Sequence, residues 1–234
     1  LFSYTNTKKY KYDEELIKAY TRQRNKAEKE AMNLIIHHLF GQHVNPLHRY
    51  PPSHSHFSYK DYPERKELSK EEKEYVAAYD NATRYNDSVV SMIIDLYKEK
   101  DAVIIYFADH GDEANDYRIH QGRSRGMEKL GAPCLHCQLD IPFFIYTSNS
   151  FSQKHPQTTK RISEAIHRPF MTDDLPHLLI DMAGIRTKWY VPSRSLINKA
   201  YNPNRKRIIK GFSLKGSLDY DEVCNSAEPW SIGF

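Results

Sequence analysis

The sequence predicts an α/β domain in which helices cover a mainly parallel β-sheet. Three apolar runs rich in β-branched and aromatic residues, at residues 33–40, 102–107 and 141–146, indicate strands. A long helical pattern between the first two runs and two shorter ones after the third give the order strand, helix, strand, loop, strand, helix, helix. That order is typical of layered α/β folds.

Length and composition bound the class of protein. The 234 residues are enough for one large domain or two small ones, and 39% hydrophobic with 27% charged residues is a globular balance rather than a disordered or fibrous one. The formal net charge of +4 is spread along the chain, apart from a basic run at residues 204–207. No nucleic-acid partner is therefore expected.

The start of the chain raises the question of its completeness. No segment reaches the roughly 20 apolar residues that span a bilayer, and no signal-peptide pattern follows Leu1, so the chain as given is expected to be soluble. Because it starts without Met in a polar, Lys- and Tyr-rich segment, we expect it to be a piece of a longer protein.

The first elements surround a long loop. Residues 8–29 are strongly charged with apolar positions at helical spacing, which predicts a surface helix without catalytic residues. The run at 33–40 predicts a buried strand that opens into G-Q-H, residues 41–43. Residues 44–63 are rich in Pro, His, Ser and Tyr without a period and predict a long loop, a class of segment that is often functional.

The central elements are a capped helix and two strands. Ser69, with Glu72 three residues later, predicts a helix start, and the amphipathic pattern continues to Lys100. The strand at 102–107 lacks alternation, as expected when both faces of a sheet are covered. A long polar loop leads from it to the strand at 141–146.

The last elements are helices followed by a polar tail. Residues 158–167 predict a short helix, and the T-D-D of residues 172–174 predicts the cap of another helix that stops at Gly184. Beyond Lys188 the tail is rich in Tyr, Arg and Ser and is expected to add short antiparallel strands.

The three cysteines leave several interpretations open. Cys134 and Cys137 form a C-x-x-C with His136 between them, which fits a local disulfide, a redox pair or half a zinc site. A structural zinc site needs two further ligands, and the remaining cysteine, Cys224, is far along the chain. A surface-loop disulfide or two free thiols are the favoured interpretations.

Two polar clusters follow predicted strands: G-Q-H ending at His43 and D-H-G-D-E starting at Asp109. Ligands of open α/β sheets bind beyond the carboxyl ends of the strands, so both clusters are candidates for one site. The carboxylate of Asp109 and the imidazole of His110 suit zinc, and Gly111 permits the backbone to break there. From residue types alone, an Asp-His turn hydrogen bond and a structural His43 remain open alternatives.

The pattern along the chain resembles a known family. The matching stretches are H-L-F-G-Q-H with R-Y-P behind it, Y-D-N-A-T-R-Y-N-D, Y-F-A-D-H-G-D-E, D-I-P-F, and T-D-D-L-P-H through A-G-I, at residues 38–43, 49–51, 79–87, 106–113, 140–143, 172–177 and 183–185. In this order they resemble the catalytic domains of the bacterial phosphoethanolamine transferases, membrane-anchored members of the alkaline phosphatase and sulfatase superfamily.

The resemblance implies a three-layer alkaline-phosphatase-like domain whose amino-terminal part is missing. On that basis the whole chain, residues 1–234, is a partial sulfatase-like catalytic domain. Its core is residues 31–197, preceded by a surface helix at 1–30 and followed by a tail at 198–234.

The resemblance also implies roles for individual residues. In the family, zinc is held by an Asp-His pair, an upstream Glu and the oxygen of a Thr nucleophile, and the pair maps onto Asp109 and His110. Zinc lowers the pKa of a bound hydroxyl and neutralises phosphoryl charge. The histidine that contacts the phosphoryl group in the family's glycine-x-histidine segment maps onto His43.

The chain departs from the family pattern after the Asp-His pair. The family has a second phosphoryl-contacting histidine there, and the nearest candidate is His120, with one residue inserted and the loop spacing altered. His136 and Arg123 are alternatives for that role.

A second departure concerns the nucleophile. Thr5 and Thr7 lie in a polar stretch with no predicted strand before it, and Thr83 lies inside the predicted helix. The nucleophilic Thr and the upstream Glu are therefore expected before Leu1, and the fragment is not expected to turn over substrate alone.

The implied function is transfer of phosphoethanolamine from a phospholipid donor to a lipid A or glycan acceptor through a Thr phosphoenzyme. The implied location is the inner membrane, held by missing amino-terminal helices, with the catalytic domain in the periplasm, where a Cys134 disulfide to Cys137 or Cys224 would be stable.

Two alternatives remain. A sulfatase or phosphodiesterase on the same scaffold would hand the group to water, although the C-x-P-x-R or S-x-P-x-R segment of type I sulfatases is absent from the sequence. A noncatalytic binding domain would use Asp109 and His110 only to close a turn.

Overall fold

The computed structural model describes residues 2–6, 9–24, 32–117, 120–123, 132–210 and 216–225. The chain divides into two compact units. The first comprises Leu1–Leu96 and Ala114–Gly122, and the second comprises Tyr97–Glu113 and Arg123–Phe234. Among the described helices, none has the length and apolar character needed to cross a membrane.

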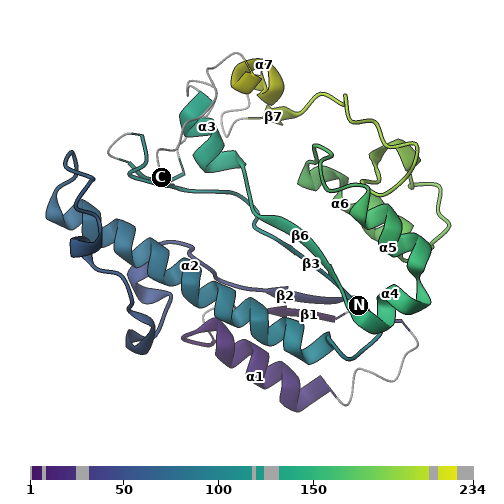
Figure 1. Ribbon diagram of the computed structural model, residues 1–234, viewed down its shortest axis with the longest axis horizontal. Helices are drawn as coiled ribbons and strands as arrows, with labels where there is room; N and C mark the ends of the chain where they lie inside the picture. Colours follow the sequence, from purple (N-terminus) through teal and green to yellow (C-terminus); the bar gives the residue numbers. More distant parts are fainter. Residues whose placement is uncertain are drawn as a thin grey trace. The chain divides into compact units, whose positions relative to one another are not determined.

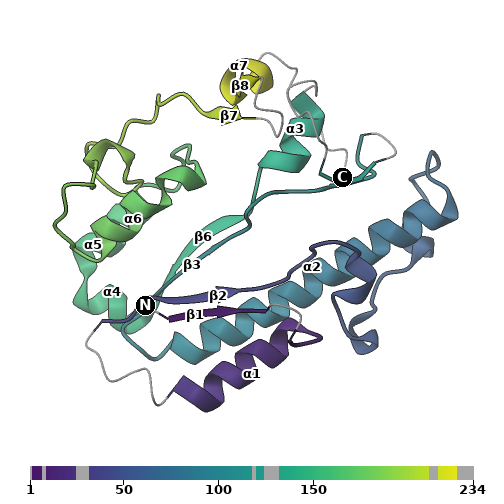
Figure 2. The ribbon, with the colours of Figure 1, turned by 180° about the vertical axis from the view of Figure 1, so that it is seen from behind.

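The first unit contains a parallel strand pair beside two helices. β1 (Phe2–Thr5) pairs with β2 (Ile35–His38). α1 (Asp13–Gln23) lies alongside α2 (Lys70–Tyr97), as both ribbon views show (Figure 1, Figure 2). The stretch predicted as a surface helix also contains the strand β1, which the sequence pattern did not predict.

The predicted strand at 33–40 is confirmed as β2, but the expectation that it is buried is wrong. Tyr4 and His37 are partners in the β1–β2 register, and both rings contact Tyr20 of α1 at centroid distances of 4.8 Å. Because side chains alternate along a strand, Leu34 and Ile36 face the other way and are 44% and 43% exposed.

The predicted long helix is confirmed as α2, and so is its cap. The backbone N–H of Glu72 donates to Ser69 Oγ at 3.2 Å, and the N–H of Ser69 donates to Glu72 Oε2 at 2.6 Å. These reciprocal bonds satisfy donors that a helix start leaves open. The buried Asn81 accepts the N–H groups of His56 and Phe57, which anchors the preceding loop on α2. That loop holds three short 3₁₀ helices, η2 (Pro46–His48), η3 (Pro52–His54) and η4 (Tyr59–Asp61).

The second unit is built on an antiparallel ribbon. β3 (Val103–Phe107) pairs with β6 (Phe143–Thr147), with Ile105 opposite Ile145. Both strands were predicted, but the expected parallel direction is wrong for this pair. Parallel neighbours need a crossover helix that covers the sheet. The helix in the intervening segment, α3 (Ala132–Leu139), instead packs on the carboxyl-terminal elements. Two-residue strands β4 (Glu113–Ala114) and β5 (Gln121–Gly122) also pair in this segment.

Short helices follow β6 and form the core of the second unit. Leu178 and Ile197 are almost fully buried there, together with Ala165 and Leu196. The elements are α4 (Asn149–Lys154), α5 (Pro156–Ser163), η6 (Thr172–Asp174), α6 (Leu175–Met182) and η7 (Pro192–Arg194). The predicted stop of α6 is confirmed, since Gly184 has φ 62°.

The helix predicted to follow residues 172–174 does begin there, with Asp174 as its N-cap residue, but the predicted side-chain cap does not form. The side chain of Asp174 makes no cap hydrogen bond. The carboxylate instead accepts from Arg194 and from Arg205 Nε, the latter at 3.0 Å. A buried carboxylate is stabilised more by guanidinium groups than by a helix N–H, which explains the difference.

The described part of the tail folds as an antiparallel strand pair and a short helix. β7 (Ile208–Lys210) and β8 (Ser217–Asp219) are antiparallel, which confirms the prediction, and α7 (Tyr220–Asn225) follows. Tyr220 and Cys224 pack on Leu135 of α3. The tail is therefore part of the second unit's packing.

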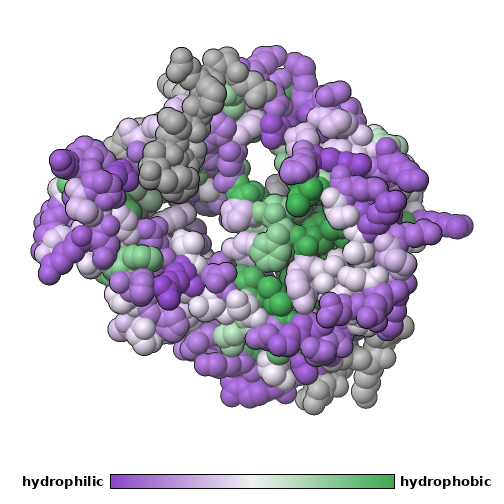
Figure 3. Space-filling model, in the orientation of Figure 1, coloured by the Kyte–Doolittle hydropathy of each residue, from purple (hydrophilic) through white to green (hydrophobic). Residues whose placement is uncertain are grey.

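The visible surface is largely hydrophilic, and apolar residues gather over the β3–β6 ribbon (Figure 3). Phe107 and Phe144, on the two strands, are each 37% exposed. Because Phe107 is opposite Phe143 and Phe144 is opposite Tyr106, these two partly exposed rings lie on opposite faces of the ribbon.

Leu178→Ala is expected to lower the free energy of unfolding by about 2–5 kcal/mol, because it opens a cavity at a position with 0% exposure. Ile166→Ala, at a position with 77% exposure, is the matched control and should change it by less than about 0.5 kcal/mol. Urea denaturation of both variants checks this, and equal losses would contradict the packing described.

His37 predicts a pH dependence of stability. Burial lowers its pKa from the ordinary 6.5 to about 4, so the folded state holds the neutral imidazole. The corresponding stability is complete above pH 6.5 and is lost as the pH falls towards about 4. The melting temperature should fall less steeply over that range in His37→Phe than in the unmodified chain, whereas His38→Phe, at an exposed neighbour, should keep the full slope. Identical slopes in all three proteins would refute the assignment.

Candidate functional site

Asp109 and His110 follow the end of β3 and lie next to each other in space. The N–H of His110 donates to Asp109 Oδ1 at 3.1 Å, and His110 Nε2 lies 3.7 Å from Asp109 Oδ2. The side chain of Asp109 is 87% exposed and that of His110 is 17% exposed. The pair therefore presents a carboxylate oxygen and a ring nitrogen together.

The hydrogen bonds of His110 select the nitrogen that is able to bind a metal. Nδ1 lies 2.8 Å from the carbonyl oxygen of Gly111, which suits a protonated Nδ1 that donates to it. Nε2 then carries the lone pair, the usual arrangement of a metal-bound histidine. Nδ1 also lies 3.6 Å from Asp112 Oδ1.

The pair fits two corners of a zinc site. Bonds of about 2.0–2.2 Å in a tetrahedron place two ligand atoms about 3.4 Å apart, close to the 3.7 Å between Asp109 Oδ2 and His110 Nε2. Within the described ranges, no group of three or more His, Cys, Asp or Glu side chains is arranged to hold a metal ion.

Gly111 is required for close packing, and the strand does end before it, since β3 stops at Phe107. Gly111 is not among the glycines with positive φ, and its N–H donates to the carbonyl oxygen of Gln138 at 3.0 Å. A Cβ at this position would lie 2.2 Å from the carbonyl oxygen of Cys137. Gln138 also donates to the buried Glu113 at 3.2 Å. α3 thus packs against the backbone of the Asp-His turn and holds it in place.

His43 lies in the first unit, on an exposed turn after β2. Its N–H donates to the carbonyl oxygen of Phe40 at 3.0 Å, and its own carbonyl oxygen accepts from Arg49 Nε at 2.5 Å. The buried Asp13 accepts the N–H groups of Phe40 and Gly41. Asp13 was missed from the sequence, where it is one of several acidic residues at a helix start.

The candidates for the second histidine differ in their surroundings. His120 is partly buried in the first unit, and its carbonyl oxygen accepts the N–H of Asn115 at 2.9 Å. His136 lies on α3 in the second unit, where Nδ1 is 2.7 Å from Asp140 Oδ2 and 3.1 Å from the hydroxyl of Tyr220. Arg123 is exposed.

The threonines and cysteines resolve several open points. Thr5 ends β1, so a strand does precede it, and Thr7 lies outside the described residues. Thr83 is confirmed within α2, where its hydroxyl donates to the carbonyl oxygen of Tyr79 at 3.0 Å.

All three cysteines, Cys134, Cys137 and Cys224, are free thiols. The disulfide interpretation is therefore wrong, and the free-thiol alternative holds.

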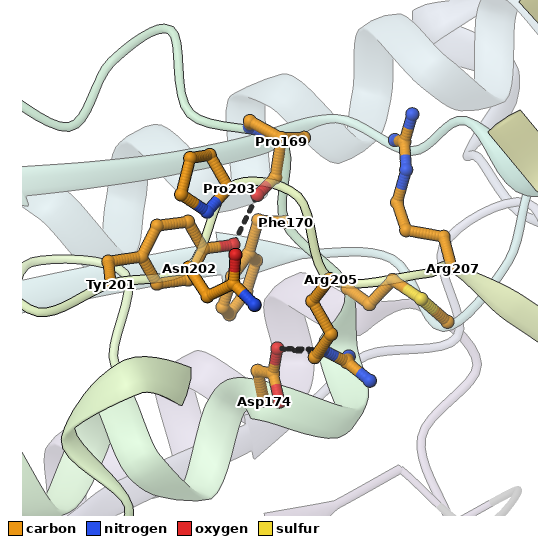
Figure 4. Close-up of a pocket in the computed structure, with 9 residues that line it drawn as sticks. Pro169, Phe170, Asp174, Tyr201, Asn202, Pro203, Arg205 and Arg207 are labelled. Carbon is orange, nitrogen blue, oxygen red and sulfur yellow. Dashed lines mark hydrogen bonds and ion pairs between the residues drawn. The ribbon is translucent and has the colours of Figure 1, made fainter.

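A small cavity lies near the tail, away from these residues in sequence. Figure 4 shows Tyr201, Arg205 and Asp174 around it, with Arg205 paired to Asp174. Its volume of about 10 Å³ is close to the minimum for one water molecule. It is too small for a substrate, and its arginine is already paired with a carboxylate.

Gly111→Ala is expected to displace the Asp-His turn, because the added Cβ cannot fit 2.2 Å from the backbone of α3. The imidazole signals of His110 in ¹H–¹⁵N NMR spectra should shift. Gly184→Ala is the control: its φ of +62° makes it strained, but nothing lies within 4 Å, so the His110 signals should stay in place. Unchanged His110 signals in Gly111→Ala would contradict the close approach.

Comparisons with known proteins assign the chain to a family. Residues 2–185 match the sequence model of the Sulfatase family. The phosphoethanolamine transferase EptC of Escherichia coli O18:K1:H7 is 32% identical over 192 residues, which are 81% of this chain and 32% of that protein. The phosphoethanolamine transferase CptA of Salmonella typhimurium is 32% identical over 199 residues, 84% of this chain and 33% of that protein. The chain thus spans about a third of the length of these relatives.

Solved structures agree with this placement. The C-terminal periplasmic domain of EcEptC from Escherichia coli has a TM-score of 0.77 at 29% identity, covering 91% of this chain and 58% of that one. Its complex with Zn has a TM-score of 0.74 at 28% identity, covering 94% and 60%. These neighbours confirm the predicted alkaline-phosphatase-like fold class. The chain belongs to the sulfatase family and is homologous to the phosphoethanolamine transferases.

Proposed function

We propose that this chain is the metal-binding carboxyl-terminal part of a phosphoethanolamine transferase catalytic domain. The whole protein would move phosphoethanolamine from a phospholipid donor to a lipid A or glycan acceptor. The observation that carries the proposal is the Asp109–His110 pair, whose Oδ2 and Nε2 atoms lie 3.7 Å apart on a turn fixed by α3. The transferase names of the relatives and the Zn complex of a neighbour support it.

The residues divide the chemistry among them. Asp109 and His110 would hold zinc, which supplies a lowered hydroxyl pKa and charge for the phosphoryl oxygens. His43 would donate a hydrogen bond to a phosphoryl oxygen, and His120 is the proposed second contact. The Thr nucleophile and an upstream Glu ligand are proposed to come from sequence before this chain. Attack by Thr would form a phosphoethanolamine ester and release the diacylglycerol of the donor.

The proposed location follows from the same relationship. The catalytic domain would lie in the periplasm and be held at the inner membrane by amino-terminal helices. Two of the neighbours are C-terminal periplasmic domains, which supports this proposal. In that setting the phospholipid donor is presented at the membrane surface.

The test uses the longest reading frame that contains this chain, expressed in bacteria that lack phosphoethanolamine transferases. Mass spectrometry should show phosphoethanolamine on lipid A or another glycan. Asp109→Ala and His110→Ala should each lower the transfer by about 100-fold or more, because each removes a zinc ligand. The amount of bound zinc, measured by elemental analysis, should fall in the same variants.

Two controls and two alternative outcomes complete this test. His167→Ala and Asp87→Ala change exposed residues of the same types and should keep both transfer and zinc. Phosphoethanolamine released to water without acceptor modification would instead indicate the sulfatase- or phosphodiesterase-type hydrolase. An intact protein that contains no zinc and transfers nothing would indicate a noncatalytic binding domain.

A further inference from the structure

A buried carboxylate ties the first helix to the turn that carries His43. Asp13, the first residue of α1, is 5% exposed. Its Oδ1 accepts from Asn6 Nδ2 at 2.9 Å and from the N–H of Phe40 at 3.0 Å, and its Oδ2 accepts from the N–H of Gly41 at 3.0 Å. A charge withdrawn from water needs such donors, so the contacts fix Asp13 and the backbone together.

The turn around His43 has an unfavourable backbone conformation. Gly41 has φ 55°, Val44 has φ 39° and Asn45 has φ 59°. Positive φ is rare for a β-branched residue such as Val44, and strain of this kind costs of order 1–3 kcal/mol. It persists only where surrounding contacts enforce it, and such strain clusters at functional sites.

Arg49 holds the other side of the same turn. Its Nε donates to the carbonyl oxygen of His43 at 2.5 Å, and its Nη2 donates to that of Val44 at 2.8 Å. The guanidinium also lies over the ring of Phe40 at 4.5 Å. A planar guanidinium makes two directed bonds and a ring contact at once, which a lysine cannot reproduce.

Asp13 and Arg49 therefore bind complementary backbone groups, N–H and carbonyl, of one short segment. Asp13 binds the N–H groups before His43, and Arg49 binds the carbonyl oxygens at and after it. We propose that Asp13 and Arg49 are positioning residues that set the backbone of His43, so that its imidazole meets the phosphoryl group in one orientation. This inference rests on the proposed function, because it needs His43 to contact the phosphoryl group.

The test is a kinetic one on the full-length protein that contains this chain, with phosphatidylethanolamine as donor and purified lipid A as acceptor. Arg49→Lys and Asp13→Asn should each lower kcat by about 10- to 100-fold, as expected for a misplaced catalytic contact, while KM for the donor changes little. Arg49 is only partly buried, so Arg49→Lys is expected to fold even if Asp13→Asn does not. Glu14→Gln and Arg186→Lys are the matched controls and should keep kcat.

A double-mutant cycle separates positioning from a purely structural role. In the His43→Ala background, Arg49→Lys and Asp13→Asn should cause no further loss of kcat, because the group that they position is already absent. Additive losses, or an unchanged kcat in Arg49→Lys, would overturn the inference. A silent His43→Ala would instead overturn the role of His43 in the proposed function, and the positioning role with it.

Discussion

Buried carboxylates organise the irregular parts of this chain, because a charge removed from water must be surrounded by hydrogen-bond donors. Asp13 gathers backbone N–H groups of the turn after β2, and Asp174 gathers two arginines from the region after α6. The partly buried Asp181 likewise has four donors, which are Arg161, Tyr190, Ser195 and Asn198. Burial raises the pKa of Asp181, but the hydrogen bonds outweigh it and hold that pKa below its ordinary value. In each case one carboxylate accepts the hydrogen bonds that hold the surrounding groups in place.

Local features were predictable from the sequence. The Ser69–Glu72 capping box, the length of α2 and the stop at Gly184 depend on residues close together in the chain, so a pattern of a few residues contains their cause. The direction of β3 relative to β6 is different. This direction depends on where α3 packs. The apolar contacts of α3 are with Tyr220 and Cys224, which lie far along the sequence.

The candidate site divides in the same way. Asp109 and His110 are adjacent in sequence, and a carboxylate beside an imidazole is recognisable there as a candidate metal-binding pair. The tautomer of His110 depends on the Gly111 carbonyl oxygen, and the need for glycine depends on the backbone of α3. Asp13 could not be recognised, since it contacts backbone groups 27 and 28 residues away, and backbone groups leave no signature in a sequence.

The packing of the tail has a consequence for where this domain ends. The family match stops at residue 185, yet Leu196 and Ile197 complete one core, and Tyr220 covers Leu135 on α3. The hydroxyl of Tyr220 also donates to Asp140, just beyond α3. A protein trimmed to residues 2–185 would uncover the helix that supports the Asp-His turn. The stretch that the family model matches is therefore shorter than the stretch whose packing supports the Asp-His turn.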